Sequence, residues 1–329
     1  MRVATVGLLV ADVMAPISGM PRRGELVRVP SITMHNGGNA MTAAINLHTL
    51  GVETELIGKV GKDAFGEFLL KRLSDYGVSA KGVKLDPEAQ TSVSLVLLDG
   101  GERSFLHTVG ANATLSFEDI DFSVIESADA VFLTGAFLMD GLDGEGAKRL
   151  FKKCKELGKT TFLDVCFDAK GRWGEVIYPA LPYVDYFMPS IDEAKRIAGF
   201  DGTPDEIADE FSRHGGHNTV IKLGSRGSYL RLKGEEAGRI YPSERVENPI
   251  DTTGAGDSFC SGFIAAFARG FEPSECMRYA NRAGSLCVQE MGATAWARPF
   301  DELKKLEQKE LEQKKQNERI RAEESEEKI

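Results

Sequence analysis

The chain has 329 residues, with 40 Lys and Arg against 50 Asp and Glu, so its formal net charge is -10 at neutral pH. Hydrophobic residues make up 42% of it, which supplies a sizeable core and excludes a mostly disordered chain. The acidic balance argues against a nucleic-acid partner, because a negative surface repels phosphate backbones.

The cysteines and the apolar runs predict the compartment. The five cysteines include no closely spaced pair, which argues against a disulfide scaffold. The apolar start is interrupted by Asp12, so it indicates a buried strand rather than a signal peptide. No run reaches the roughly 18 apolar residues that a membrane helix needs. We therefore expect a cytoplasmic protein without a membrane partner.

The first third of the chain predicts strands and helices in a mixed order. The predicted elements are a strand at 3–10, a strand at 25–34, a helix at 39–50, a strand at 53–60, a helix at 65–76, and a hairpin of strands at 92–98 and 103–109. Gly51 and Gly77 follow the two helices, as glycine often does at a helix end.

From residue 130 onward, strands and helices alternate. The predicted strands are 130–133, 160–165, 184–188, 219–223, 229–232 and 236–241, and the predicted helices are 144–157, 191–198, 205–213, 258–269 and 273–290. This alternation predicts an α/β fold with a mainly parallel sheet between two layers of helices. Residues 13–35 and 91–109 do not fit it and are predicted to form a small separate sheet.

The end of the chain differs in composition from the rest. Residues 301–329 hold nine Glu and one Asp against six Lys and two Arg. Their apolar pattern begins at Leu303 and Leu306 but stops short of the three or more heptads of a coiled coil. We interpret them as a charged helical tail after a domain of residues 1–300, with a partner-binding helix as the alternative.

The strongest local motif is DTTGAGDSF at residues 251–259. Gly254, Ala255 and Gly256 leave the backbone open just before a predicted helix, where amides and the helix dipole bind anions. Asp257 is either a helix N-cap or a general base. In this setting we favour a base that takes a proton from a hydroxyl while the amides neutralise a transferred phosphoryl group.

Two further glycine clusters lie beside predicted strands. Gly37, Gly38 and Asn39 open a predicted helix, and Asp12 follows the first predicted strand; alone, such a Gly-Gly pair is an ordinary turn. Together they predict a site for a polyhydroxylated ligand, because ligands of open α/β sheets bind beyond the carboxyl ends of strands.

The cluster that follows the predicted strand at 219–223 is either a hairpin turn or the wall of a nucleotide pocket. It contains Lys222, Gly224, Ser225 and Gly227. In the small sheet, His107 faces either the ligand or solvent, and we count it as a candidate ligand contact.

Together these motifs resemble the ribokinase-like (PfkB-type) carbohydrate kinase family over roughly residues 1–300. The segment DTTGAGDSF is close to the second signature of the family, and residues 37–61 resemble the first. The resemblance implies a Rossmann-like three-layer αβα domain with a small inserted β-sheet lid, formed by about 13–35 and 91–109, that closes over a sugar. It implies ATP-dependent phosphorylation of a sugar hydroxyl.

The resemblance also implies roles for single residues. Asp257 would be the base, and the anion hole would be Gly254, Ala255 and Gly256. The sugar would contact Asp12, Gly37, Gly38 and Asn39, to which we add His107. The ATP site would include Gly224, Ser225, Gly227 and Asn281, to which we add Lys222. A monovalent cation, potassium, would lie by Asp251 and Thr253, and Mg²⁺ would accompany ATP near Glu193.

Departures from the family pattern leave the substrate open. Thr42 stands where the first signature usually has Asn, and Val10 stands where ribokinase has Asn; both speak against ribose. A nucleoside kinase of the same fold and a catalytically silent sugar-sensing protein are the alternatives. Because exposed sheet edges are usually covered, we also expect a homodimer formed through the lid.

Overall fold

The computed structural model describes residues 1–99 and 102–309. Within these residues, the main sheet has nine strands in the order β13-β12-β11-β10-β9-β8-β1-β4-β5. Its strands are β1 (Arg2–Gly7), β4 (Glu53–Gly61), β5 (Ser79–Asp86), β8 (Ala130–Ala136), β9 (Thr160–Val165), β10 (Tyr186–Phe187), β11 (Asn218–Lys222), β12 (Ser228–Arg231) and β13 (Arg239–Tyr241). Neighbours from β5 to β11 run parallel, whereas β12 and β13 are antiparallel additions at the edge.

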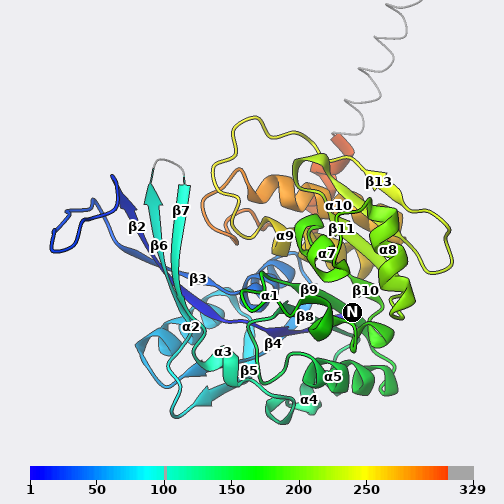
Figure 1. The fold of residues 1–329 in the computed structure, drawn as a ribbon, viewed down its shortest axis with the longest axis horizontal. Coiled ribbons are helices and arrows are strands. Elements are labelled where there is room, and N and C mark those ends of the chain that lie inside the picture. The colour runs from blue at the N-terminus through cyan, green and yellow to red at the C-terminus, as the bar shows by residue number, and fades with distance from the viewer. Residues whose placement is uncertain (100–101, 310–329) are drawn as a thin grey trace, which may run out of the picture.

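Helices cover both faces of this sheet (Figure 1). One layer holds α1 (Asn39–Thr49), α2 (Ala64–Tyr76), α9 (Ala255–Phe267) and α10 (Pro273–Cys287). The other holds α4 (Phe122–Ser127), α5 (Glu145–Glu156), α6 (Trp173–Ile177), α7 (Ile191–Ala198) and α8 (Pro204–Arg213). The short helices are α3 (Ala111–Thr114), η1 (Phe117–Asp119), η2 (Leu181–Tyr183) and η3 (Gly224–Arg226). The predicted three-layer αβα architecture is confirmed.

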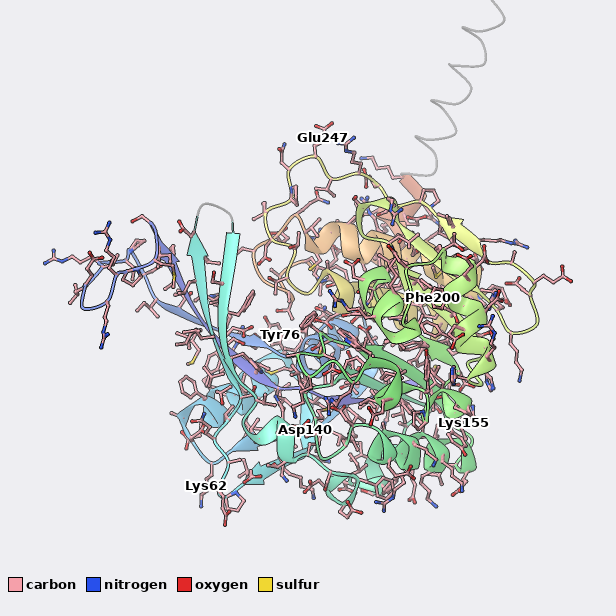
Figure 2. The ribbon with its side chains drawn as sticks, viewed as in Figure 1. Lys62, Tyr76, Asp140, Lys155, Phe200 and Glu247 are labelled. Atoms are coloured by element: carbon pink, nitrogen blue, oxygen red, sulfur yellow. The ribbon has the colours of Figure 1, made fainter. Side chains whose placement is uncertain are left out.

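Successive residues of a buried strand supply the two hydrophobic cores. Phe162 of β9 packs with Phe263 of α9 on one face of the sheet. The next residue, Leu163, belongs to the core on the opposite face, together with Phe151 of α5. This alternation follows from the two-residue period of a strand. Figure 2 shows the side chains of both cores filling the space between the layers.

A second sheet of four strands projects from the edge of the domain (Figure 1). Its order is β3-β2-β6-β7, with β2 (Val10–Ile17), β3 (Thr33–Gly37), β6 (Val93–Asp99) and β7 (Glu102–Thr108). Strands β6 and β7 pair antiparallel with Asp99 opposite Glu102, so the predicted hairpin is present. This sheet, called the lid below, resembles the predicted lid.

Four predictions about elements were wrong. The strand predicted at 3–10 is two strands: β1 ends at Gly7, and β2 begins at Val10 in the lid. The chain leaves the main sheet after Gly7. This position requires glycine, because its φ is 143° and because a Cβ there would lie 2.0 Å from the Thr134 carbonyl oxygen. Asp12 therefore lies on the lid, not at the end of the first strand. Residues 25–32 form no strand, and β3 begins only at Thr33.

The other two corrections concern an edge strand and a helix start. Strand β5 was not predicted, because Ser79–Asp86 is a half-exposed edge strand in which four lysine, serine or glycine positions interrupt the apolar pattern. Helix α9 begins at Ala255, three residues before the predicted start, because small residues at its first turn carry no apolar periodicity.

Asn112 fixes the crossing from the main sheet to the lid. Its side chain is 1% exposed; Oδ1 accepts the Leu9 N–H at 3.2 Å, and Nδ2 donates to the Leu9 carbonyl at 2.9 Å. Leu9 lies between β1 and β2, so neither of its backbone groups has a ladder partner there. The amide of Asn112 supplies both partners that a buried backbone needs.

Residues 300–309 form a helix after α10. This helix includes the start of the segment that was predicted to be a separate tail. Leu303 is fully buried, and the Glu307 carboxylate accepts from Arg278 of α10 at 2.8 Å. These contacts attach the start of the segment to the domain. The rest of the predicted tail, residues 310–329, lies outside the described residues. In the part of the chain that the structure describes, no helix combines the length and apolar character needed to cross a bilayer.

Candidate active site

Two strand ends and one helix start converge at one edge of the main sheet. Asp164 lies at the carboxyl end of β9, Lys222 is the last residue of β11, and Asp257 lies in the first turn of α9. In parallel sheets the carboxyl ends of strands meet at the same edge, which is where ligands of α/β proteins bind. This convergence defines the candidate active site.

The α9 N-terminus presents open backbone to the site. Gly254 is the N-cap with φ 74°, and a Cβ there would lie 2.2 Å from the Ala293 Cβ, so only glycine fits. Ala255 and Gly256 follow in the first helical turn, at the positive end of the helix dipole, and the Ala255 N–H donates to the Thr252 carbonyl at 3.3 Å. Asp257 is the third residue of the helix, so the interpretation of Asp257 as the N-cap is wrong.

The Asp257 carboxyl group is held by Asn39, the first residue of α1. Asn39 Nδ2 donates to Asp257 Oδ1 at 2.9 Å. Burial raises the pKa of Asp257 to about 7, the charge of Asp164 adds to the rise, and the hydrogen bond from Asn39 opposes it. A carboxyl group with a pKa near neutrality is suited to general base catalysis at neutral pH.

Lys222 and Asp164 form a buried ion pair beside Asp257. The Lys222 ammonium lies 2.8 Å from both Asp164 oxygens. Burial disfavours the charged ammonium, but the charges of Asp164, Cys260 and Glu193, together with the hydrogen bond to Asp164, outweigh it and raise the pKa of Lys222. Burial likewise raises the pKa of Asp164 to about 6, against the pull of Lys222, so the pair is ionised at neutral pH. Sequence reasoning missed Asp164, although a carboxylate at a strand's carboxyl end was the signal used for Asp12.

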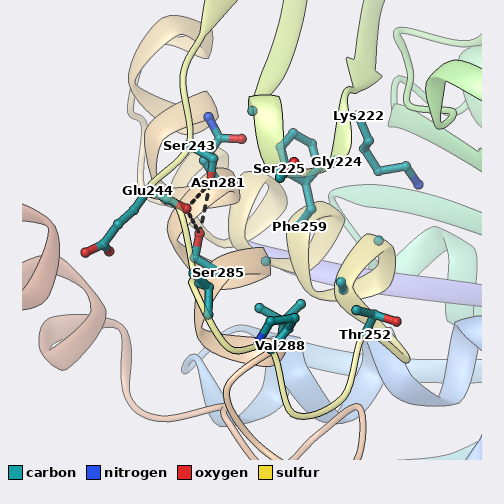
Figure 3. Close-up of a pocket in the computed structure, with 16 residues that line it drawn as sticks. Lys222, Gly224, Ser225, Ser243, Glu244, Thr252, Phe259, Asn281, Ser285 and Val288 are labelled. Atoms are coloured by element: carbon teal, nitrogen blue, oxygen red, sulfur yellow. Dashed lines mark hydrogen bonds between the residues drawn. The ribbon is translucent and has the colours of Figure 1, made fainter. Parts of the chain in front are cut away.

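A cavity of about 300 Å³ lies between β11, the loop after β13, α9 and α10 (Figure 3). Its lining includes five residues predicted for ATP: Lys222, Gly224, Ser225, Gly227 and Asn281. Asn281 donates to the Tyr241 carbonyl at 2.9 Å, and Ser243 contacts Ser285 at 2.9 Å across one wall. Phe259 supplies an apolar wall. An apolar cavity with few polar groups is typical of small-molecule sites.

A second cavity of about 510 Å³ adjoins the first. Lys222, Gly224 and Gly256 line both cavities. The second also contains Asn39, Asp164, Glu193, Gly254 and Asp257. The α9 N-terminus therefore stands between two spaces, with the Asp257 carboxyl group in the second.

The predicted metal-binding residues have protein partners of their own. Asp251 is 2% exposed, and its two oxygens accept the Thr253 N–H at 2.7 Å and the Gly292 N–H at 3.0 Å. Glu193 accepts the Ser190 N–H and hydroxyl, each at 2.7 Å. Among the described residues, no group of three or more His, Cys, Asp and Glu is arranged to hold a metal ion.

The lid carries the remaining predicted residues. Asp12 of β2 lies against Gly37 so closely that a Cβ on Gly37 would meet Asp12 Oδ2 at 2.0 Å. Burial raises the pKa of Asp12 to about 6, and the Ser94 hydroxyl opposes the rise as a hydrogen-bond donor. Asp12, Gly37, Gly38 and His107 line neither of the two cavities.

Comparison with known proteins identifies the family. Residues 1–299 match the model of the pfkB family of carbohydrate kinases. The chain belongs to this family. The ribokinase of Arabidopsis thaliana is 30% identical over 306 residues, which cover 88% of the chain and 76% of that protein. The ATP-dependent ribose-1-phosphate kinase of Halopiger xanaduensis is 29% identical over 298 residues, covering 89% and 93%.

A solved structure confirms the fold of this pfkB-family chain. The structure of Arabidopsis thaliana ribokinase complexed with ribose and ATP superposes with a TM-score of 0.81 at 27% identity. It covers 93% of the chain and 98% of its own. The predicted family and the ribokinase-type α/β fold are thus confirmed.

Proposed function

We propose that the chain is an ATP-dependent sugar kinase with Asp257 as its general base. One observation carries the proposal: a carboxyl group with a pKa of about 7 stands at the helix N-terminus that separates two adjoining cavities. That arrangement suits a nucleotide on one side and a hydroxyl acceptor on the other. The ribose and ATP in the ribokinase neighbour support the same pairing.

In the proposed transfer step, each of these groups has one task. Asp257 takes the proton of the acceptor hydroxyl, the hydroxyl oxygen forms a bond to the γ-phosphorus, and the bond from that phosphorus to the β–γ bridging oxygen breaks to release ADP. The amides of Gly254, Ala255 and Gly256 stabilise the charge on the transferred group. Asn39 orients the base through its hydrogen bond to Oδ1.

We also propose which residues contact the sugar and the nucleotide. Asp12, Gly37, Gly38, Asn39 and His107 would bind the sugar, and Lys222, Gly224, Ser225, Gly227 and Asn281 would bind ATP. Lys222 is charged but already paired with Asp164, so it would act on the phosphates as half of an ion pair. Ser225 and Asn281 lie in the lining of the first cavity, as a nucleotide site requires.

The residues proposed for the Mg²⁺ and K⁺ sites supply oxygen donors. Mg²⁺ and K⁺ take carboxylate and carbonyl oxygens. Glu193 lines the second cavity and would hold Mg²⁺ indirectly, and Asp251 with the Thr253 carbonyl would hold a monovalent cation. Because the described residues offer no complete metal cluster, ATP would supply part of the Mg²⁺ coordination. Bound Mg²⁺ would neutralise phosphate charge.

Replacing Asp257 tests the function directly. ADP formation would be followed across a panel of sugars and ribonucleosides for wild type, Asp257→Asn and the surface control Asp75→Asn. Loss of the base is expected to lower kcat by about 10²- to 10⁴-fold, while the control keeps wild-type activity. Comparable turnover of Asp257→Asn and wild type would falsify the assignment. Sugar binding by the wild type without ADP formation would instead favour a sugar-sensing protein.

A further inference from the structure

Among the described residues that line the two cavities, Lys222 is the one lysine or arginine. It lines both cavities, so it lies where they adjoin. The acidic residues in the two linings are Asp164, Asp192, Glu193, Glu244 and Asp257. A triphosphate carries several negative charges, so among these side chains only the Lys222 ammonium group can form an ion pair with it.

The Lys222 ammonium group lies beside the N-terminus of α9. A Cβ added to Gly256 would lie 3.3 Å from Lys222 Nζ, so glycine at this position leaves room for the ammonium group. A cation is unfavourable there by itself, because the N-terminus is the positive end of the helix dipole. An anion between the two positive groups removes the conflict, and helix N-termini bind phosphate for the same reason. The arrangement therefore fits an anion bound where the two cavities adjoin.

Asp164 fixes the position of the ammonium group. Both carboxylate oxygens of Asp164 accept from Lys222 Nζ at 2.8 Å. Oδ1 also accepts the Val165 N–H at 2.9 Å, and Oδ2 accepts the Cys260 thiol at 3.5 Å. The Asp164 side chain is 2% exposed, whereas that of Lys222 is 13% exposed. The carboxylate is therefore held on all sides by the protein, while the ammonium group keeps access to the cavities.

One N–H of the ammonium group remains for a ligand. An ammonium group has three donors, and the two oxygens of Asp164 take two of them. The Cys260 sulfur lies 4.0 Å from Nζ, but a sulfur atom is a weak acceptor compared with a phosphate oxygen. Lys222 can therefore bind a phosphate oxygen without leaving Asp164.

Stability alone does not explain a buried ion pair at this place. Burial of two charges costs free energy that their mutual attraction offsets only in part. Neutral residues of similar volume often replace such a pair without loss of stability. The charges of Lys222 and Asp164 therefore point to a role in binding or catalysis.

We infer that Lys222 is a catalytic residue that contacts the phosphoryl group during its transfer, and that Asp164 is a positioning residue that holds the ammonium group for this contact. The inference rests on the proposed kinase function and adds two residues to its mechanism. Lys222 keeps its three protons throughout, while Asp257 takes the proton of the acceptor hydroxyl. Its charge stabilises the oxygens of the phosphoryl group while the bond to the acceptor oxygen forms and the bond to the β–γ bridging oxygen breaks.

Single and double variants of the pair test the two roles. Lys222→Met is expected to lower kcat about 100-fold or more, with KM for the acceptor within about threefold, because the lost charge acts on the transition state. Asp164→Asn should lower kcat at least about tenfold, because the ammonium group remains but is no longer held in place. Lys222→Met/Asp164→Asn should lose no more activity than Lys222→Met alone. A further loss in the double variant, as direct binding of Mg²⁺ by Asp164 would give, overturns the positioning role.

Melting curves separate a functional loss from a structural one. Lys222→Met leaves a buried carboxylate without its cation and should melt below the wild-type temperature, whereas the double variant removes both charges and should melt near it. A double variant that melts normally and keeps wild-type kcat overturns the inference. Lys155→Met is the matched control and should keep wild-type kcat. Lys155 contacts both oxygens of Asp185 at 2.8 Å in the same way but lines neither cavity.

A binding measurement separates this inference from the proposed function. Calorimetry in the presence of Mg²⁺ would compare ADP with β,γ-imido-ATP, which carries a γ-phosphate but is not cleaved. The wild type should bind the imido analogue about tenfold more tightly than ADP, and Lys222→Met should bind both nearly equally. The same preference in both proteins overturns the contact with the γ-phosphate. Absence of ADP formation with every acceptor would contradict the kinase function, but the binding comparison would still decide the role of Lys222.

Discussion

At the scale of single residues, three aspartates near the α9 N-terminus and the end of β9 have different hydrogen-bond partners. Asp164 faces an ammonium group, Asp251 accepts backbone N–H groups, and Asp257 accepts a side-chain amide. The cation keeps the first ionised, whereas burial beside a second carboxylate raises the pKa of the third to about 7. The partners, not the residue type, determine which carboxyl group is suited to exchange a proton.

The pKa of Asp257 predicts the pH dependence of activity. A base must be unprotonated, so kcat/KM for the sugar should rise about tenfold per pH unit below 7 and level off above it. Initial rates at saturating ATP, from about pH 5.5 to about pH 9, measure the profile. Asn39→Ala removes a group that lowers the pKa and should move the inflection to higher pH. A profile that is flat through pH 7 in the wild type contradicts the assignment.

At the scale of elements, helices α7 and α8 begin with the same capping motif. Each starts with a capping box, made by Ser190 and Glu193 in α7 and by Thr203 and Glu206 in α8. Only α7 brings its glutamate to the second cavity. The cap fixes the Glu193 carboxylate at the mouth of the site, and the same cap on α8 offers an internal control.

The two capping boxes allow the role of Glu193 in Mg²⁺ binding to be separated from its role in folding. Glutamine also serves in a capping box, so Glu193→Gln and Glu206→Gln should both melt near the wild-type temperature. Glu193→Gln alone should raise the Mg²⁺ concentration for half-maximal activity about tenfold or more. Magnesium titrations of the two variants decide the point. Equal Mg²⁺ dependence in both leaves Glu193 with a capping role only.

At the scale of the whole molecule, the lid has two unlike faces. One face holds Asp12, Ser94 and His107, which are in register across β2, β6 and β7. The opposite face carries Val13 in register with Met34 and Leu95, and Leu95 in register with Leu106. Met34, Leu95 and Leu106 are 40%, 43% and 64% exposed. A contiguous exposed apolar face is typical of an interface, which supports the proposed homodimer through the lid.

That proposal predicts the effect of one charge on the oligomeric state. The wild type should sediment as a dimer at micromolar concentration, and Leu106→Glu should sediment as a monomer because a charge cannot be buried unpaired in an apolar interface. Phe200→Glu replaces an equally apolar, 40% exposed residue on the main domain (Figure 2) and should stay dimeric. A monomeric wild type, or a dimeric Leu106→Glu, contradicts a dimer through this face.

The sequence predicted the site in part. Asp257 with its glycine-rich turn was proposed from the sequence because one short segment carries both the small residues and the carboxylate. Asn39 and Asp257 are 218 residues apart, and no local sequence pattern indicates their hydrogen bond. Asp164 was not predicted because its role depends on the ion pair with Lys222. The two side chains meet only because β9 and β11 lie in one sheet.

The sequence by itself determined the fold class, the family and most of the helices and strands of the main domain, because these depend on periodicity and on short motifs. Only the tertiary structure decided that Asp12 lies on the lid, that Ser94 contacts His107, and that Lys222 is paired with Asp164. Each of these depends on the register between strands that are distant in the chain. Register is set by packing and turn geometry across the whole sheet, so it is not visible in any single segment.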